Sequence, residues 1–323
     1  MVMAIRVTAT GGPDVLVPAD IDVPAPGADE VLIRHTAIGV NYIDTYFRSG
    51  LYKAALPFTP GQEAAGVIEA IGANVTIFKP GDRVVYLHTP GAYAEKRVVP
   101  AEKCVPVPDG VSDEVAAAVL LKGLTAQYLL RRTFKVGPEH TILYHAAAGG
   151  VGLILGQWAK HLRATVIGTA GSLDKVELAL QNGFDHVINY RSEDFVARTL
   201  ELTHGKKVDV VYDSVGKDTF PGSLDVLKRL GLWVSFGQSS GPVPPFDIGI
   251  LNAKGSLFAT RPTIFHYNAE RETLLASARE MFDLINGGII KVAIHQRFAL
   301  KDARLAHEAL EGRATTGATI LIP

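Results

Sequence analysis

The stretch T-I-L-Y-H-A-A-A-G-G-V-G, residues 141–152, decides the fold of this chain. Its first six residues form a short, apolar, β-rich run, and residues 153–161 continue with apolar side chains at helical spacing. Between the expected strand and the expected helix lies the motif A-x-G-x-x-G, formed by Ala147, Gly149 and Gly152. This is the dinucleotide-binding fingerprint with alanine in the place of its first glycine.

Each part of the motif has a physical role at a bound pyrophosphate. Gly149 has no Cβ, so the backbone can approach the phosphates, and Gly152 lets the helix pack closely on the strand. The helix start, including Gly150 and Val151, offers free N–H groups and a partial positive charge. A second apolar run at 164–168 stands where a βαβ unit requires its second strand. The pattern therefore predicts a dinucleotide site, the alternative being only a glycine-rich turn in an α/β domain.

The rest of the chain divides into a β-rich first part and an alternating second part. Residues 1 to about 120 contain the expected strands 31–37, 66–71 and 83–87. From Ser112 onward helical segments appear, followed by further strand–helix units and a last parallel strand at 255–260. This order predicts an α/β fold with a doubly wound parallel sheet. Later elements are expected at 273–284 and 303–310 (helices), 296–300 (extended) and 318–322 (strand). The final strand has nothing of its own to pair with, and we expect it to return to the β-rich part.

Composition narrows the class of protein. A chain of 323 residues suits two domains. The net charge of −1, from 32 basic and 33 acidic residues, argues against nucleic acid or an anionic membrane as the main partner. No apolar run approaches the ~20 residues that a membrane span needs, and no secretory signal is visible, so we expect a cytoplasmic protein. The single cysteine, Cys104, excludes intrachain disulfides and multi-cysteine metal sites.

Segments spread over nearly the whole chain resemble one known group. In order, they are G-V-N-Y-I-D-T-Y-F-R-S-G (39–50), G-Q-E-A-A-G-V-I (61–68), K-P-G-D-R-V (79–84), L-K-G-L-T-A (121–126), A-A-A-G-G-V-G (146–152), V-V-Y-D-S-V-G (210–216) and V-S-F-G-Q-S-S-G (234–241). The sequence resembles the medium-chain dehydrogenase/reductase superfamily, and within it the zinc-free NADPH:quinone oxidoreductases that include zeta-crystallin.

This resemblance implies a domain organisation. We expect a β-rich, GroES-like catalytic domain at 1–122, completed by the C-terminal segment 262–323, and a Rossmann domain at 123–261. It also implies a homodimer that pairs Rossmann domains through the edge strand 256–260, whose unpaired backbone groups need a partner.

The resemblance also bears on metal chemistry. In the zinc-dependent members, the places of Asn41, Gln62 and Lys122 carry zinc-binding Cys or His residues. An amide or an ammonium does not suit Zn²⁺, which prefers thiolate, imidazole or carboxylate ligands, and the four-cysteine lobe is also absent. We therefore expect no bound metal and no zinc catalysis.

Cofactor choice depends on the end of the second parallel strand. NAD-binding proteins usually place an acid there to bind the ribose 2′-OH, but residues 168–172 contain none. Ser172, Lys175 and Tyr190 follow, and a hydroxyl, a cation and a phenol can hold a 2′-phosphate, which favours NADPH. Taken alone, Lys175 would be a solvated helix residue. The resemblance adds cofactor-binding positions at Asn41, Tyr46, Thr125, Gly171, Ser214, Phe236, Ser239, Phe258 and Arg313, with Phe236 and Phe258 alternatively in the core.

The predicted reaction is NADPH-dependent quinone reduction by hydride transfer. The substrate pocket is expected between the domains, near the candidate catalytic residues Asn41, Tyr46 and Tyr52, whose amide and phenols can donate to a quinone oxygen. For the two tyrosines, surface packing is an alternative. Two other functions stay open. One is an NADPH-dependent reductase of α,β-unsaturated carbonyls, and the other is a nucleotide-gated RNA-binding or structural protein.

Overall fold

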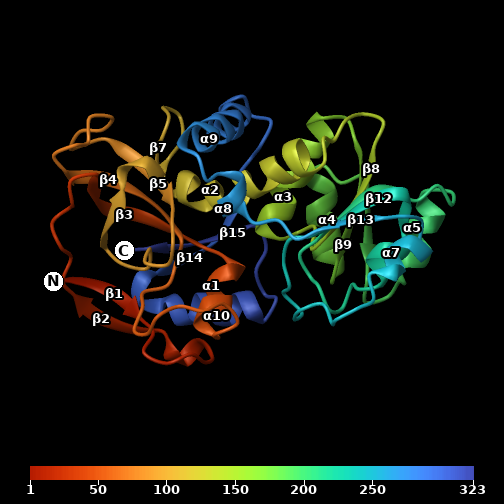
Figure 1. Ribbon diagram of the computed structural model, residues 1–323, viewed down its shortest axis with the longest axis horizontal. Coiled ribbons are helices and arrows are strands. Elements are labelled where there is room, and N and C mark those ends of the chain that lie inside the picture. The colour runs from red at the N-terminus through yellow and green to blue at the C-terminus, as the bar shows by residue number, and fades with distance from the viewer. The chain divides into compact units, whose positions relative to one another are not determined.

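The computed structural model describes residues 1–323, which form two compact units (Figure 1). Unit 1 comprises residues 1–122, 270–286 and 292–323, and unit 2 comprises residues 123–269 and 287–291.

Unit 2 is built on a six-stranded parallel sheet in the order β10-β9-β8-β11-β12-β13. Its strands are β8 (Thr141–His145), β9 (Thr165–Ala170), β10 (His186–Asn189), β11 (Val208–Asp213), β12 (Leu227–Ser235) and β13 (Phe258–Thr260). Its helices are α3 (Gly150–His161), α4 (Leu173–Gln181), α5 (Phe195–Leu202), α6 (Gly222–Asp225), α7 (Gly249–Ala253) and α8 (Ile264–Tyr267). The strand order reverses between β8 and β11, which makes that edge the point where such sheets bind ligands. The doubly wound parallel sheet expected from the sequence is confirmed.

The strands of unit 2 are apolar because helices cover both faces of a parallel sheet. Leu143, Ile167, Val211 and Trp233, from four neighbouring strands, lie in one buried cluster. Burial on both faces explains why these segments show continuous apolar runs rather than alternation.

Unit 1 contains a larger, mainly antiparallel sheet in the order β14-β15-β3-β4-β5-β7, with β6 also paired to β3, and a separate β1-β2 pair. The strands are β1 (Val2–Arg6), β2 (Val17–Ile21), β3 (Glu30–Val40), β4 (Glu63–Ile71), β5 (Arg83–Leu87), β6 (Lys96–Pro100), β7 (Cys104–Pro106), β14 (Ile294–Ala299) and β15 (Ala318–Ile322). The α-helices of this part of the chain are α1 (Tyr42–Arg48), α2 (Asp113–Tyr128, which continues into unit 2), α9 (Arg271–Asn286) and α10 (Ala303–Glu311). Shorter helical turns cover Pro13–Val15, Ala101–Lys103, Leu129–Thr133 and Leu300–Asp302.

The C-terminal strand returns to the β-rich unit, as expected from the sequence. β15 pairs antiparallel with β3, in the register Ile320 opposite Gly39. The expectation that it has no partner of its own was wrong, because β15 also pairs in parallel with β14. The extended stretch before α10 is long enough to form that neighbouring strand.

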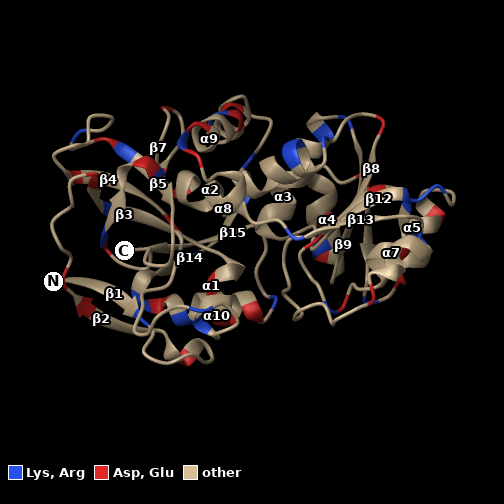
Figure 2. Cartoon of the chain, in the orientation of Figure 1, with Lys and Arg blue, Asp and Glu red and all other residues tan.

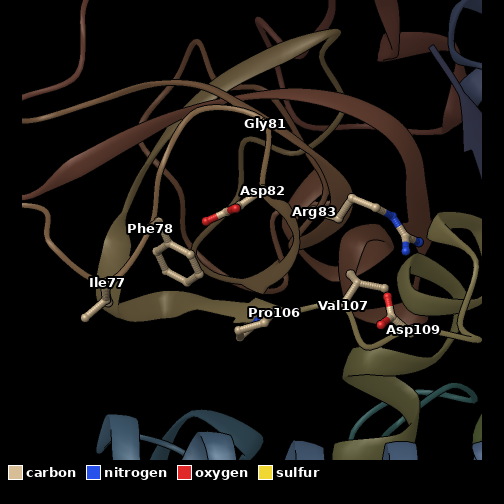
Figure 3. A pocket seen from close by; sticks show the side chains of 8 residues that line it. All are labelled: Ile77, Phe78, Gly81, Asp82, Arg83, Pro106, Val107 and Asp109. Carbon is tan, nitrogen blue, oxygen red and sulfur yellow. The ribbon is translucent and has the colours of Figure 1, made fainter.

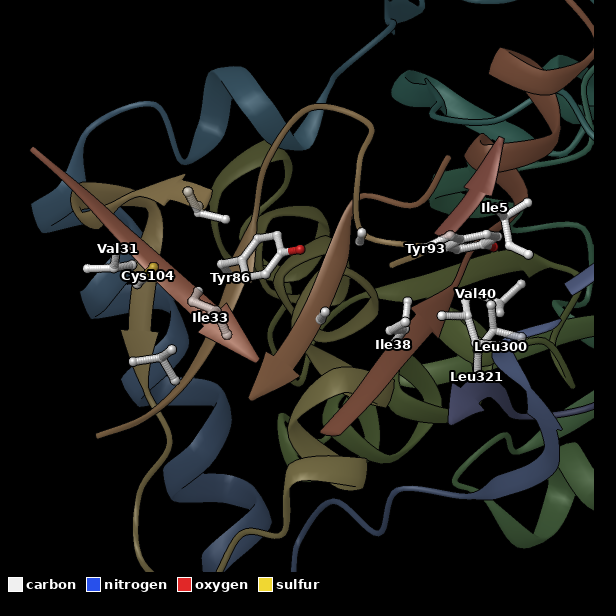
Figure 4. Close-up of a cluster of buried hydrophobic side chains, with 14 of the residues drawn as sticks. Ile5, Val31, Ile33, Ile38, Val40, Tyr86, Tyr93, Cys104, Leu300 and Leu321 are labelled. Atoms are coloured by element: carbon white, nitrogen blue, oxygen red, sulfur yellow. The ribbon is translucent and has the colours of Figure 1, made fainter. Parts of the chain in front are cut away.

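The core of unit 1 combines residues from both ends of the chain. Figure 4 shows Ile5, Val31 and Ile38 in the same cluster as Leu300 and Leu321. All five are completely buried. The C-terminal segment is therefore part of this core rather than an appendage to it.

Charged residues of both signs are spread along the chain. Figure 2 shows Lys and Arg interspersed with Asp and Glu along the elements of both units, in keeping with the near-zero net charge. None of the helices has the length and apolar character needed to cross a bilayer.

Candidate active site

The turn between β8 and α3 has the geometry of a phosphate-binding loop. Gly149 is the N-cap of α3, so the N–H groups of the first turn, including those of Gly150 and Val151, have no partner within the helix. No acidic side chain stands in that turn. A Cβ at Gly152 would lie 2.3 Å from the carbonyl oxygen of Ala147, so only glycine permits this close packing. The turn can accept an anion at these N–H groups.

Polar residues gather at the carboxyl ends of β9 and β10. Ala170 ends β9, Gly171 follows it, and Ser172 is the N-cap of α4, whose first turn carries Lys175. Tyr190 follows β10, and its N–H donates to the carbonyl of Ala170 at 3.1 Å. Its hydroxyl oxygen stands only 2.4 Å from the place of a Cβ at Gly171. The structure thus brings Gly171 and Tyr190 together, with Ser172 and Lys175 at the adjoining helix start.

The loops after β11 and β12 hold further candidates. The N–H of Ser239 donates to the carbonyl of Ser214 at 3.1 Å, so these two loops are joined. Phe236 follows β12, and its half-buried ring lies 6.0 Å from that of Tyr144. Ser214, Phe236 and Ser239 therefore share the carboxyl edge of the sheet.

Two further candidates of unit 2, Thr125 and Phe258, differ in how far they are buried. Thr125 is buried on α2, where only 6% of it is exposed. Phe258 lies on β13 at the edge of the sheet and is 60% exposed, so the alternative that it is a core residue was wrong.

Asp213 was not singled out in the sequence, yet it organises the loop that carries Ser214. Its buried carboxylate accepts hydrogen bonds from the N–H groups of Val215 and Gly216 and from the hydroxyls of Thr219 and Ser223. The available signal was D-S-V-G directly after a buried strand, because an aspartate there can bond the next backbone N–H groups.

In unit 1, the three catalytic candidates gather around α1. Asn41 is the N-cap of α1 and is 4% exposed, because β3 ends directly before it in the sheet. The rings of Tyr46 and Tyr52 lie 5.2 Å apart in an edge-on contact. The N–H of Tyr52 donates to the carbonyl of Tyr46 at 2.9 Å, which ties the following loop to the helix.

The side chain of Asn41 is part of a buried ion-pair network. Its Nδ2 donates to Glu63 Oε1 at 2.8 Å, and Lys122 Nζ lies 3.2 Å from the same oxygen. Glu63 Oε2 accepts from the N–H of Leu121 at 2.6 Å. The neighbouring Gln62 amide is buried, and neither of its polar atoms has a partner. No group of three His, Cys, Asp or Glu side chains is placed to hold a metal ion.

A second buried chain of hydrogen bonds begins at Arg48 and ends at Asp44. Arg48 Nη1 donates to His307 Nδ1, so His307 carries its proton on Nε2 and donates to Tyr93, whose hydroxyl donates to Asp44 Oδ2. The same Asp44 oxygen accepts from the backbone N–H of Asn41 at 2.9 Å. Burial raises the pKa of Asp44 to about 7 and lowers that of His307 to about 3. The sequence alone did not indicate this chain of hydrogen bonds.

Arg313 follows α10, the helix that Arg48 anchors. Both oxygens of Glu311 accept from the Arg48 guanidinium, at 2.7 and 2.8 Å. Arg313 itself is exposed and has a φ of 57°, a left-handed conformation uncommon for a residue with a side chain. Arg313 therefore lies in a turn directly after α10, and the Arg48–Glu311 ion pair holds the end of that helix in place.

An open pocket of about 420 Å³ in unit 1 contains none of these residues. Figure 3 shows its lining, which includes Phe78, Asp82, Arg83 and Val107. Arg83 is itself paired with Asp113. We assign the pocket no role in the candidate site.

Family models match both units of the chain. Residues 27–109 match the alcohol dehydrogenase GroES-like domain, and residues 150–280 match the zinc-binding dehydrogenase family. A GroES-like domain together with a Rossmann sheet defines a medium-chain dehydrogenase/reductase.

Full-length relatives narrow the class. The quinone oxidoreductase of Salmonella typhimurium is 54% identical over 97% of both chains, and the 2-haloacrylate reductase of a Burkholderia species is 43% identical over 100% of this chain and 99% of its own. The crystal structure of Escherichia coli quinone oxidoreductase complexed with NADPH superimposes with a TM-score of 0.98 at 50% identity, covering 99% of this chain and 100% of that one. The chain belongs to the quinone oxidoreductase family, as its sequence motifs indicated.

Proposed function

We propose that this oxidoreductase uses NADPH to reduce quinones and needs no zinc. The observation that carries the proposal is the phosphate-binding turn of unit 2, in a domain with no acid at the end of β9. Unit 1 separately supplies a buried amide donor at Asn41. The full-length similarity to relatives named quinone oxidoreductase supports the substrate class.

The residues of unit 2 fit NADPH. The N–H groups at Gly149 and Gly150 suit the pyrophosphate, since no Cβ and no acid obstruct them. Ser172, Lys175 and Tyr190 supply a hydroxyl, a cation and a phenol for the 2′-phosphate. The further cofactor contacts in this proposal are Asn41, Tyr46, Thr125, Val151, Gly171, Ser214, Phe236, Ser239, Phe258 and Arg313.

When bound, NADPH supplies the hydride. The protein's part is to orient the acceptor and to stabilise the negative charge that develops on its oxygen. The Asn41 amide donates to that oxygen, and the phenols of Tyr46 and Tyr52 are the further donors on the same helix and loop. In this proposal, residues 1–122 and 262–323 form the substrate domain, and residues 123–261 form the cofactor domain.

The residues around Asn41 do not fit a zinc ion. Lys122 brings an ammonium to 3.2 Å from Glu63, where a cation already balances the carboxylate. Asn41 offers an amide, and neither group matches the thiolate, imidazole or carboxylate ligands of zinc. The polarising group in this proposal is therefore an N–H donor and not a metal.

A second candidate activity is the reduction of α,β-unsaturated carbonyls. The observation that favours it is the 43% identity to a relative named 2-haloacrylate reductase. The donor at Asn41 serves a carbonyl oxygen of either substrate class, so the two candidates differ only in which acceptors the site admits.

The test is a turnover screen of the chelator-treated protein with NADPH and NADH, against a small quinone, an α,β-unsaturated carbonyl and no acceptor. We expect kcat/KM to be highest for NADPH with the quinone. Turnover confined to the unsaturated carbonyl would establish the second candidate. Loss of activity to the chelator, restored by zinc, would refute the zinc-free proposal.

We also propose a homodimer formed through β13. This edge strand has unpaired backbone groups, and exposed apolar side chains lie on it (Phe258), on the neighbouring strand β12 (Leu230) and at the start of α7 (Ile248). A second copy of the same edge supplies the missing backbone partners.

A further inference from the structure

Glu63 is a fully buried carboxylate with no role in the reaction proposed above. It begins β4, and the register of β4 on β3 places it opposite Gly39. A Cβ at Gly39 would lie 2.3 Å from Glu63 Oε1, so the glycine leaves the space that the carboxylate occupies. The backbone thus accommodates a charged group in the interior of unit 1, which is costly unless that group is paired.

Three donors converge on this carboxylate. Lys122 Nζ and Asn41 Nδ2 both reach Oε1, at 3.2 and 2.8 Å, and the N–H of Leu121 reaches Oε2 at 2.6 Å. Lys122 balances the charge, and Leu121 N–H fixes the carboxylate plane from the backbone of α2. Both groups therefore hold Glu63 in one orientation.

A held carboxylate determines which way the Asn41 amide faces. A carboxylate only accepts hydrogen bonds, so the amide must turn its NH₂ group toward Glu63, because the flipped amide would set two oxygens against each other. One N–H of Nδ2 is used by Glu63, and the other N–H of the same group remains as a donor. Asp44 holds the backbone N–H of Asn41 at the same time, at 2.9 Å.

We infer that Glu63 is a positioning residue that presents the second Asn41 N–H to the carbonyl oxygen of the acceptor. This inference rests on the proposed function, in which Asn41 stabilises the developing negative charge. Lys122, 3.2 Å from Glu63 Oε1, is the partner that offsets the cost of burying this side chain.

The variant that tests the inference must keep the charge balanced. Glu63→Gln alone would leave the Lys122 ammonium buried without a partner, so we combine it with Lys122→Met. We call this double variant the balanced pair. A glutamine at position 63 can face Asn41 with either its oxygen or its NH₂, so residue 63 no longer excludes the flipped amide, and only the capping-box contact with Asp44 still favours one orientation. We expect kcat with a quinone to fall about ten- to hundredfold, while the Kd for NADPH changes less than twofold.

A double-variant comparison separates positioning from a general structural effect. Asn41→Ala is made alone and together with Glu63→Gln/Lys122→Met. If Glu63 acts through Asn41, the combined protein has the same kcat as Asn41→Ala alone. If the two losses multiply, or if the balanced pair retains the wild-type kcat, the inference is overturned. If Asn41→Ala leaves kcat unchanged, the proposed role of Asn41 fails as well, which distinguishes the two failures.

A readout independent of turnover is the side-chain amide signal of Asn41, observed by NMR in asparagine-labelled protein without cofactor and assigned by its loss in Asn41→Ala. We expect one N–H protected from exchange in the wild type and unprotected in the balanced pair; equal exchange in both would overturn the inference. The matched control is Glu69→Gln. Glu69 lies on the same strand in an exposed ion pair with Lys96, and its replacement should leave both kcat and the Asn41 signal unchanged.

Discussion

At the scale of single residues, a residue whose contacts are local in sequence can be predicted, and a residue whose partners are distant in sequence cannot. The turn formed by Gly149 and Gly152 was predictable because its geometry depends on the chain just before and after it. The contacts of Glu63 and His307 were not, because their partners lie far along the sequence. Asn41 is 22 residues from Glu63, and Tyr93 is 214 residues from His307. A buried polar side chain has no sequence pattern of its own, so only the fold reveals what it bonds.

The same scale shows one refinement of the fingerprint. The sequence places Ala147 where the first glycine of the motif belongs, but the residue with a left-handed backbone is its neighbour, Ala146, with a φ of 65°. Alanine at this position carries some strain, and its place at the candidate phosphate turn fits the tendency of such strain to gather at functional sites.

Asp44 supplies a pH-dependent prediction. Burial raises its pKa to about 7 in the folded protein, above the ordinary 3.8. A carboxyl with a raised folded pKa stabilises the protein below its unfolded pKa, and this contribution is lost as the pH rises through about 7. Asp44→Asn removes the titration. We therefore expect the stability of the wild type relative to Asp44→Asn to fall by about 2 kcal/mol between about pH 5 and pH 7.

The measurement is urea unfolding of both proteins across that range, followed by circular dichroism. Comparing the two variants cancels the buried histidines His35 and His307, whose lowered pKa values act with the opposite sign and add stability as the pH rises toward their ordinary value of 6.5. A stability difference that does not change with pH would show that Asp44 does not titrate in this range.

At the scale of elements, long periodic segments were predictable and one short helix was not. The strands at 208–213 and 318–322 and the helix beginning near 150 appear in the structure where the sequence indicated them. The seven-residue helix α1 was missed, because Y-I-D-T-Y-F-R is too short and too rich in aromatic residues to show helical periodicity. Its available signal was the capping box formed by Asn41 and Asp44.

The packing of α3 against its turn gives a prediction for Gly152→Ala. The new Cβ would lie 2.3 and 2.7 Å from the carbonyl oxygens of Ala147 and Ala146, which are backbone atoms and cannot rotate away. The start of α3 must then shift, and we expect the Kd for NADPH to rise about tenfold or more, with a lower Tm. Fluorescence titration measures the Kd.

The control for this change is Gly249→Ala on α7. Its Cβ would meet only the flexible side chain of Asp247, at 3.1 Å, so we expect no effect on NADPH binding. An unchanged Kd in Gly152→Ala would contradict the close packing assigned to this turn.

At the scale of the whole molecule, the fold and the family were predicted from the order of the segments along the chain. A β-rich start, an alternating middle and a returning last strand are together far more specific than any one motif, and the family assignment confirmed that interpretation. The pairing of β15 with β14 was not predictable, because both strands are short and their parallel register depends on the intervening α10.

The proposed dimer is tested by light scattering at micromolar concentration. We expect a mass of twice 34.6 kDa for the wild type and a monomer for Phe258→Lys, which places a charge on the edge strand. Val17→Lys replaces another exposed apolar side chain, on β2, and should leave the mass unchanged. A wild-type mass of 34.6 kDa would refute the dimer.

The central claim is that unit 2 binds a cofactor carrying a 2′-phosphate, at the carboxyl ends of β9 and β10. It is tested by the Kd values of NADPH and NADH for the wild type and for Lys175→Ala, at one fixed salt concentration because such contacts are screened. A charge-assisted bond contributes about 1.5–3 kcal/mol, so we expect Lys175→Ala to weaken NADPH about tenfold or more and to leave NADH nearly unchanged. Tyr190→Phe should act in the same direction with a smaller effect, since it removes only a neutral hydroxyl. Equal losses for both cofactors, or no loss for either, would contradict the assignment of the 2′-phosphate to Lys175.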